Sequence, residues 1–391
     1  MKVFKKKILP ILLTLFTVSF LTILSLLYAR GYRISLDNPK DGNSIEPKIV
    51  VKKTGILAVR SIPNSAKIYI DGKLVDITDA TLSSLAPGKY QIRIQKEGFE
   101  VWEREVEVYE DLVTDITALL VLKGGGLNPL TNNGVTDFEL SKNGELLAYL
   151  SKGEEKPGLW AIQLSNSPIN IFQTNKKALA LDSPGFTYSS AASIQWSPDD
   201  QEILVKMNDA AYLLVDLSKP PTQVPQSFSN PTQIFEKWAT LQYKNKKAIV
   251  DAIEIPETLK VLAMSDKSMW SPDGKKFWFF DDNTSTDYTY IQVYNFKEPL
   301  PVGEKVINET LKYRKDVVLP NIYWYSDSEH LILADTSSIK IINIDGFNMF
   351  ELFSGNVIDS KAYPAPAGDR IIISSKFKSD APQNLYTISI R

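Results

Sequence analysis

The sequence contains no cysteine and one histidine, His330, among its 391 residues. The absence of cysteine excludes disulfide bonds, thiolate metal sites, a lipidated cysteine anchor and a cysteine nucleophile. A single histidine also excludes metal sites built from several imidazole ligands. We therefore expect neither a cofactor nor a metal centre of these kinds.

Neither sign of charge dominates the chain, since 44 Lys and Arg stand against 46 Asp and Glu, for a net charge of −2. No basic field attracts nucleic acid and no nucleic-acid motif is present, so we expect no nucleic-acid partner. The composition, 43% hydrophobic and 23% charged, is typical of a folded protein. The length favours two or three structural units.

The longest apolar run lies near the N-terminus, where four lysines within residues 2–7 precede the uncharged residues 8–28, ILPILLTLFTVSFLTILSLLY. A helix of this length can cross a bilayer. No small-residue cleavage site follows. We expect residues 1–29 to be a cytoplasmic tail and an uncleaved, single-pass signal anchor in the cell membrane, with the bulk of the chain extracytoplasmic. Residues 30–54, which lack periodicity, are predicted to be a linker.

Short alternating segments follow in residues 55–122. AKIYIDGKLVD places Asp71-Gly72 between two such segments, as in a tight hairpin, and LAPGKYQIRI places Pro87-Gly88 at a turn. WEREVEV alternates in the same way. Four or five short antiparallel strands forming a small β-sandwich are predicted.

These motifs resemble those of the PEGA domain family. The run GILAVRSIPNSAKIYIDGKLVD followed by LSSLAPGKYQIRIQKEGFEVWEREVEV contains the S-x-P, Asp-Gly hairpin, P-G-x-Y and closing tryptophan elements of the family. Asn64-Ser65 and Thr78-Asp79 depart from the usual pairs, which affects loops and not the fold. The resemblance implies a non-catalytic surface module.

From residue 127 to 391 a different unit repeats. An aromatic or apolar residue, a turn, an apolar strand and an alternating strand recur five times, and MWSPDGKKFWFF and IQWSPDDQEILV are the clearest copies. Blade-like repeats of four strands need about 40–50 residues each. The sequence therefore predicts a β-propeller of five blades, with six as an alternative count. Serine, proline, aspartate and glycine in WSPDG suit a turn between strands.

The repeat resembles those of the TolB-like and WD-type propellers, in which W-S-P-D-G lies between the first two strands of a blade. In that family a strand from one end of the chain completes the last blade. The resemblance implies that LNPLTNNG, residues 127–134, supplies the outer strand missing from the fifth unit, which ends in NLYTISIR. Such closure removes free edges from the ring.

One segment, residues 230–263, has helical rather than strand periodicity. Asn230 suits an N-cap and Pro231 the first helical position, and Pro256 is expected to end or kink the helix. Packing on the propeller as a lid is one interpretation of this insertion. Partner docking is the other, with five candidate residues: Phe235, Trp238, Lys244, Lys246 and Lys247.

No catalytic constellation stands out. His330 occupies the same repeat position as Glu202 and Lys276, a position expected to be exposed, and no G-x-S-x-G motif is present. Carboxylates are the other catalytic resource, and the candidates are Asp199, Asp200, Asp281, Asp282 and Asp287. The loop 281–287, DDNTSTD, has alternating oxygen ligands suited to a cation but lacks the glycine and glutamate of the helical calcium loop.

Together these features describe an all-β protein with an N-terminal transmembrane helix, a PEGA-type sandwich and a propeller that carries one helical insertion. We expect a non-enzymatic binding or scaffolding protein of the cell envelope, which contacts another envelope protein or a cell-wall polymer. A carboxylate-based carbohydrate-active enzyme is the alternative.

Overall fold

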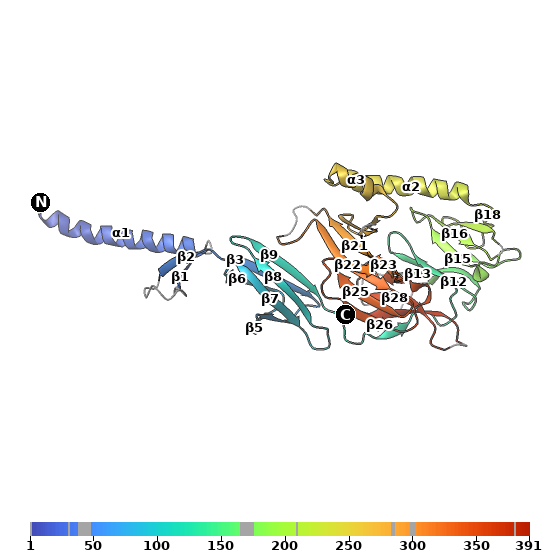
Figure 1. Ribbon diagram of the computed structural model, residues 1–391, viewed down its shortest axis with the longest axis horizontal. Helices are drawn as coiled ribbons and strands as arrows, with labels where there is room; N and C mark the ends of the chain where they lie inside the picture. Colours follow the sequence, from blue (N-terminus) through green and yellow to red (C-terminus); the bar gives the residue numbers. More distant parts are fainter. Residues whose placement is uncertain are drawn as a thin grey trace. The chain divides into compact units, whose positions relative to one another are not determined.

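The computed structural model describes residues 2–29, 32–37, 48–164, 176–208, 210–282, 286–297, 302–378 and 381–391 (Figure 1). These residues form two compact units. The first comprises Met1–Leu120 and Pro301–Glu304, and the second Val121–Leu300 and Lys305–Arg391.

The first unit begins with helix α1, Lys2–Ala29, whose described side chains run from residue 13 to 28 and are exposed. A search of the described residues finds no helix that is both long and apolar enough to span a membrane. The membrane anchor therefore stays a prediction. Strands β1, Arg33–Asp37, and β2, Lys48–Lys52, pair antiparallel, so regular structure lies within the segment predicted to be a linker.

Seven strands follow in two sheets, and both are built from short alternating segments. The three-stranded sheet has the order β6-β3-β9, with β3 at Gly55–Ile62, β6 at Ala80–Leu85 and β9 at Val113–Leu119. The four-stranded sheet has the order β5-β4-β7-β8, with β4 at Lys67–Ile70, β5 at Lys73–Ile77, β7 at Gly88–Gln95 and β8 at Trp102–Val108. The prediction of four or five antiparallel strands is corrected on two points, since there are seven strands and β3 pairs with β9 in parallel.

The two sheets share one core because one face of each strand is apolar. In β8 the buried residues are Trp102, Val106 and Val108, while the residues between them are exposed or partly exposed. They pack with Leu57, Val59 and other buried residues from both sheets. Alternation of this kind lets a sheet bury one face and leave the other in water.

The departure from the usual PEGA pair at Thr78-Asp79 is part of this packing. The Thr78 hydroxyl lies 2.5 Å from that of Ser61 and accepts a hydrogen bond from the Ala66 N–H at 2.9 Å. A carboxylate oxygen of Asp79 accepts from the Ser61 N–H at 3.1 Å. Both side chains therefore tie the segment between β5 and β6 to strand β3, and Thr78 also ties it to Ala66 in the loop before β4.

The second unit contains five four-stranded antiparallel sheets within its described residues, which resemble the blades of a propeller. We number the blades from 1 to 5 in chain order. Blade 1 has β11–β14 at Phe138–Leu140, Leu146–Ser151, Gly158–Gln163 and Lys176–Leu181. Blade 2 has β15–β18 at Ser193–Trp196, Glu202–Lys206, Tyr212–Asp216 and Gln226–Phe228. Blade 3 has β19–β22 at Met269–Trp270, Lys276–Asp281, Tyr288–Asn295 and Ile307–Arg314. Blade 4 has β23–β26 at Asn321–Trp324, His330–Ala334, Ser338–Asn343 and Phe350–Ser354.

Blade 5 combines strands from both ends of the unit. Its own strands are β27, Ala362–Pro364, β28, Arg370–Ser375, and β29, Asn384–Ser389, and its fourth strand is β10, Leu127–Pro129. Strands β10 and β29 pair antiparallel, with Leu127 opposite Ile388. The predicted completion of the last blade by residues 127–134 is confirmed, and the fourth strand covers what would otherwise be a free edge.

Neighbouring blades pack sheet on sheet. One core cluster joins blades 1 and 2, another joins blades 5 and 1, and a third joins blades 3 and 4. Because both faces of a blade are covered, the second strands are continuous apolar runs instead of alternating ones. HLILA in β24 is buried at every position, as are five of the six residues of RIIISS in β28.

The helical insertion takes the place of a sheet-to-sheet contact between blades 2 and 3. It forms α2, Thr232–Asp251, and α3, Glu257–Met264, which lie together beside the sheets containing β16 and β21 (Figure 1). Ile234 and Trp238 of α2 pack on Leu204 of blade 2. The end of α2 and the whole of α3 pack on the aromatic face of blade 3, formed by Phe277, Phe279, Tyr294 and Phe296.

The ends of these helices largely follow the prediction. The Asn230 side chain accepts hydrogen bonds from the Thr232 N–H at 3.0 Å and the Thr232 hydroxyl at 2.5 Å, so it bonds the first turn of α2, but the helix begins at Thr232 with Pro231 at the N-cap, one residue later than predicted. Pro256 lies in the break between α2 and α3. The insertion therefore folds as two helices in place of one kinked helix.

Candidate functional site

The W-S-P-D-G stretches are turns, and the same turn recurs in every blade. Each turn consists of four residues, which in blade 3 are Ser271 to Gly274. The N–H of the fourth residue of the turn donates to the carbonyl of the first, and the fourth residue has a positive φ. The fourth residues are Gly144, Asp200, Gly274, Ser328 and Gly368, with φ between 57° and 76°. Glycine adopts this conformation without strain. The geometry is kept while the side chains change, which supports a structural role for the turn.

The turn serines are held in structural hydrogen bonds. Ser271 is buried, its hydroxyl donates to Asp273 at 2.5 Å, and it accepts from the Lys276 N–H at 3.0 Å. Ser197 makes the same two bonds with Asp199 and Glu202, at 2.6 and 3.0 Å. Neither serine is hydrogen-bonded to an imidazole in these contacts. The arrangement therefore lacks the Ser–His pair that activates a serine nucleophile.

The position shared by His330, Lys276 and Glu202 was expected to be exposed, and this is wrong for two of the three. The side chain of Lys276 is 0% exposed, and its ammonium lies 2.8 Å from a carboxylate oxygen of Glu329. His330 is also buried, with Nδ1 2.7 Å from Asp327. Both lie at the start of a second strand; Lys276 contacts Glu329 of the next blade, whereas His330 contacts Asp327 and Tyr325 of its own blade. Glu202 is partly exposed and paired with Lys237 of α2.

The predicted carboxylates lie at separate places and make structural contacts. Asp200 accepts hydrogen bonds from the N–H groups of residues 142 and 143 in the turn of blade 1, at 2.6 and 2.8 Å. Asp281 accepts from Gln292 at 3.0 Å and Asp282 from Thr289 at 2.7 Å. Asp199 and Asp200 belong to a turn of blade 2, whereas Asp281, Asp282 and Asp287 belong to blade 3. The predicted set therefore does not converge as one catalytic pair.

The candidate cation loop at residues 281–287 is described only in part, because residues 283–285 lie outside the described residues. Within the part of the chain that the structure describes, no group of three or more Asp, Glu or His residues could hold a metal ion.

Of the five candidate partner-binding residues on α2, two are buried and three are exposed. Trp238 is buried, and its indole N–H donates to Glu202 at 3.3 Å. Lys246 is buried too, donates to the Ser265 carbonyl at 2.5 Å, and has its pKa lowered by burial. These two side chains stabilise the insertion and are not accessible to a partner. Phe235, Lys244 and Lys247 are exposed, so the predicted partner surface reduces to these three.

Two carboxylates that the sequence reasoning missed lie on the first strand of blade 1 and beside it. Asp137 accepts a hydrogen bond from the Ile194 N–H at 2.8 Å, and Glu139 accepts from the Trp196 N–H at 3.2 Å. They thus bind the first strand of blade 2. Asp137 also pairs with the Lys361 ammonium, which precedes the first strand of blade 5, at 2.5 Å. We call Asp137, Glu139, Tyr323, Lys361 and Tyr363 the inner-strand cluster.

Electrostatics single out Glu139 in this cluster. Burial raises the pKa of Glu139, and the nearby cations only partly offset this. Burial also raises the pKa of Tyr323 to about 12 and that of Tyr363 well above its ordinary value. A carboxyl with a raised pKa can act as a general acid. Its signal in the sequence is TDFEL, where two acidic residues alternate with apolar ones on a first strand.

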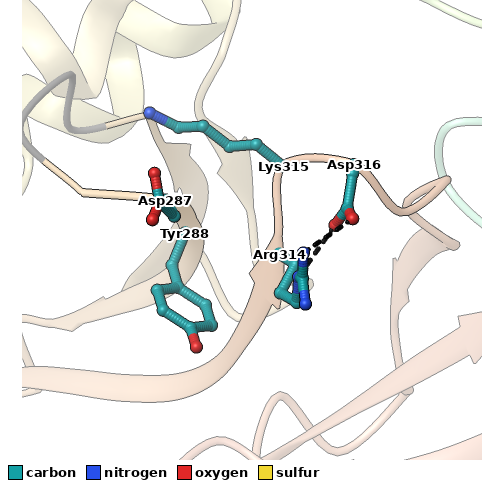
Figure 2. Close-up of a pocket in the computed structure, with 5 residues that line it drawn as sticks. All are labelled: Asp287, Tyr288, Arg314, Lys315 and Asp316. Atoms are coloured by element: carbon teal, nitrogen blue, oxygen red, sulfur yellow. Dashed lines mark hydrogen bonds and ion pairs between the residues drawn. The ribbon is translucent and has the colours of Figure 1, made fainter.

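A second polar site is an open depression in blade 3, at the end of the β21–β22 pair. It has a volume of about 350 Å³ and is lined by Asp287, Tyr288, Arg314, Lys315 and Asp316 (Figure 2). The guanidinium of Arg314 makes two hydrogen bonds to Asp316, at 3.0 and 2.9 Å. The sequence reasoning named only Asp287 from this set.

In the first unit, the edge strand β5 leaves three apolar side chains exposed. They are Leu74, Val75 and Ile77, at 57, 45 and 53%. An edge strand of this kind offers backbone donors and acceptors to another chain.

Comparison with known protein families supports the first of the two predicted modules. The PEGA domain family matches residues 54–123, close to the boundaries 55–122 expected from the sequence. The chain has no match among the curated proteins.

Solved structures also match the chain, at low sequence identity and low TM-score. TolB from Acinetobacter baumannii is 12% identical with a TM-score of 0.26, over 77% of this chain and 60% of TolB. This chain thus spans about 60% of the TolB chain it matches. The WD40 repeats of RRP9 are 6% identical with a TM-score of 0.34, over 69% of this chain and 99% of theirs. Residues 54–123 therefore match the PEGA domain family, and the region that follows contains, in its described residues, five four-stranded sheets that resemble propeller blades.

Proposed function

We propose that the chain is a non-catalytic binding and scaffolding protein of the cell envelope. Residues 1–29 anchor it in the cell membrane with the N-terminus in the cytoplasm, and the PEGA and propeller units are extracytoplasmic. They contact another envelope protein or a cell-wall polysaccharide. The support for the anchor is the uncharged run at residues 8–28 behind four lysines.

The binding role is supported by the contacts of the polar side chains that repeat from blade to blade. The turn serines and aspartates, which resemble an active-site motif in sequence, are held in hydrogen bonds within and between blades. The side chains left exposed on the insertion and on blade 3 include aromatic and cationic ones, such as Phe235, Tyr288 and Arg314. Exposed aromatic and arginine side chains are enriched where proteins bind other molecules.

For a protein partner, the surface we propose is formed by the exposed residues of α2, with Phe235 on one side of the helix and Lys244 and Lys247 further round it. Phe235 is 41% exposed, and its ring meets that of Trp238 edge on at 6.4 Å. Lys244 and Lys247 extend the same helix with cations, and Lys247 pairs with Asp251. A partner helix or loop with an apolar residue flanked by acidic ones would complement this surface.

The alternative, a carbohydrate-active enzyme, has one specific observation in its favour. It is the raised pKa of Glu139 within the inner-strand cluster. Glycoside hydrolysis needs an acid of this kind and a second carboxylate. Asp137 is the nearest candidate for the second, but its carboxylate is bound by Lys361 and by a backbone N–H.

Crosslinking in intact cells followed by membrane fractionation tests the proposal. The full chain is expected in the membrane fraction, released by detergent and not by high salt, and crosslinked to an envelope component. Phe235→Ser with Lys247→Gln should reduce a protein crosslink, while Lys219→Gln on blade 2 should leave it unchanged. Recovery of the chain in the soluble cytoplasmic fraction would contradict the proposal.

A further inference from the structure

We propose that the depression of blade 3 binds an anionic saccharide chain, through the ring of Tyr288 and the cations of Arg314 and Lys315. This rests on the proposed binding function and specifies one ligand class and one site for it.

The site is built by cross-strand pairing of β21 and β22. Tyr288 lies opposite Arg314 and Tyr290 lies opposite Lys312. Opposite residues of an antiparallel pair are on the same face, as are alternate residues of one strand. The two tyrosines and the two cations therefore share one face, and their rings and charges are adjacent, since the Lys312 ammonium lies 5.3 Å from the centre of the Tyr288 ring.

The depression opens at the end of this face, where Lys315 follows β22. The Lys315 N–H donates to the Asp287 carbonyl at 3.0 Å, which fixes the two loop ends beside each other. Figure 2 shows the Tyr288 ring and the Arg314 guanidinium on the sheet, with the Lys315 side chain extending past Asp287. An aromatic ring and two kinds of cation thus line one open space.

The charges of the depression can accept an anion. Arg314 is paired with Asp316, but their side chains are 67 and 64% exposed, and an ion pair so exposed contributes little. An incoming carboxylate or phosphate can therefore compete with Asp316 for the guanidinium, with which it would form two parallel hydrogen bonds. Lys312, on the same face, adds a further positive charge.

A saccharide fits the remaining features better than a bare anion does. The Tyr288 ring is 36% exposed and offers a flat apolar surface on which the C–H groups of a pyranose can pack. The Asp287 carboxylate can accept hydrogen bonds from sugar hydroxyls. The depression is open, as a site for one residue of a longer chain must be.

Affinity measurements with the full chain in detergent micelles test the inference, with polygalacturonate as the probe. Its fully methyl-esterified form has the same rings without the charge, and polyglutamate has the charge without the rings. We expect tight binding only to polygalacturonate, and weaker binding as salt rises. Tyr288→Ala and Arg314→Gln should each raise the Kd about tenfold. Tyr243→Ala, an exposed tyrosine of α2, and Lys219→Gln, a cation paired with Asp216, are the matched controls.

Asp316→Asn should change the Kd for polygalacturonate in the opposite direction. It frees the guanidinium of Arg314, so the Kd should fall about two- to fivefold. General damage to the site would instead weaken binding. Comparing galacturonate monomer with the polymer separates a free sugar acid from a polysaccharide as the source. Tighter binding of the polymer indicates the polysaccharide.

Three results would overturn the inference: equal binding of the acid and its methyl ester, equal binding of polyglutamate, or weaker binding by Asp316→Asn. Absence of binding to polygalacturonate would overturn it as well. If the Tyr288→Ala, Arg314→Gln double variant binds polygalacturonate as the wild type does and still crosslinks to envelope components, the depression is not the site, while the binding role stands.

Discussion

The indole N–H of Trp270 donates a hydrogen bond to the carbonyl of Ala263 in α3, at 3.0 Å. The equivalent tryptophans donate instead to the first strand of the preceding blade, Trp196 to Glu139 at 3.0 Å and Trp324 to Met269 at 2.8 Å. Helix α3 thus accepts the bond that a blade would otherwise accept. The insertion is an integral part of the ring's packing.

Trp270→Phe should therefore loosen the insertion. It removes the donor to a buried carbonyl, and the cost should be about 1–3 kcal/mol in the free energy of unfolding. Hydrogen exchange should rise in α2 and α3 and stay unchanged in blade 1. Trp196→Phe is the control, which should raise exchange at the interface of blades 1 and 2. If Trp270→Phe leaves α3 as protected as in the wild type, the account of the insertion is wrong.

Ser271→Ala tests the structural role of the W-S-P-D-G turn. The buried hydroxyl bonds both Asp273 and the Lys276 N–H, so its loss should cost about 1–2 kcal/mol of stability. Ser197→Ala should have a similar effect, because the same bonds are made there. Denaturant unfolding measures both. Envelope crosslinking by the folded variants should not change, and its loss with full stability would point to a functional serine.

The His330–Asp327 pair should make stability depend on pH. Burial alone lowers the pKa of His330, but the charge and hydrogen bond of Asp327 outweigh it, so the pKa lies above its ordinary value. Burial likewise raises the pKa of Asp327, and His330 outweighs it, so that pKa is lowered. The contribution of His330 is fully present below its unfolded pKa of about 6.5 and is lost as pH rises through the folded pKa. That of Asp327 is present above about pH 3.9 and is lost on acidification through its own folded pKa.

Because the chain has a single histidine, one labelled imidazole resonance reports its titration directly. We expect a midpoint above about 6.5 in the folded protein and a return toward that value in Asp327→Asn. The free energy of unfolding should be highest between about pH 4 and 6.5 as far as this pair is concerned. A midpoint below that of an unfolded peptide would contradict the ion pair.

Thr131→Val tests the completion of blade 5 by the N-terminal strand. Thr131 is buried, and its hydroxyl accepts the N–H of Leu385 at 2.9 Å. Valine keeps the shape but leaves that N–H without its acceptor, so stability should fall by about 1–3 kcal/mol. Exchange should rise in β29 and not in β16. Thr240→Val, on the exposed side of α2, is the control and should have little effect.

Much of the fold could be predicted from local patterns. Asp71-Gly72, Pro87-Gly88 and the alternation in WEREVEV fix the hairpins of the PEGA domain, because turn chemistry and period-two burial act over a few residues. The recurrence of the Trp270 turn gave the blades, and the short last unit indicated that residues 127–134 complete it. Asn230 and Pro256 marked the ends of the helices for similar local reasons.

What could not be predicted depends on contacts between distant segments. The parallel pairing of β3 with β9 joins residues 57 positions apart, such as Ile56 and Val113, which no local pattern encodes. Lys276 and His330 are residue types that are usually exposed, yet both are buried and paired with carboxylates, Lys276 with Glu329 of the next blade and His330 with Asp327. Glu139 has a raised pKa only because strands from other blades surround it. Sites formed where blades meet are therefore beyond single-sequence reasoning.

The central claim, that the chain binds envelope polymers without cleaving them, is tested most directly by one incubation. The full chain is mixed with purified polygalacturonate and with isolated wall polysaccharide, and both retained protein and polymer length are measured. We predict that protein is retained and that the polymers keep their length. Shortening of a polymer that disappears in Glu139→Gln, in a variant that still folds, would contradict the claim and establish the enzyme instead.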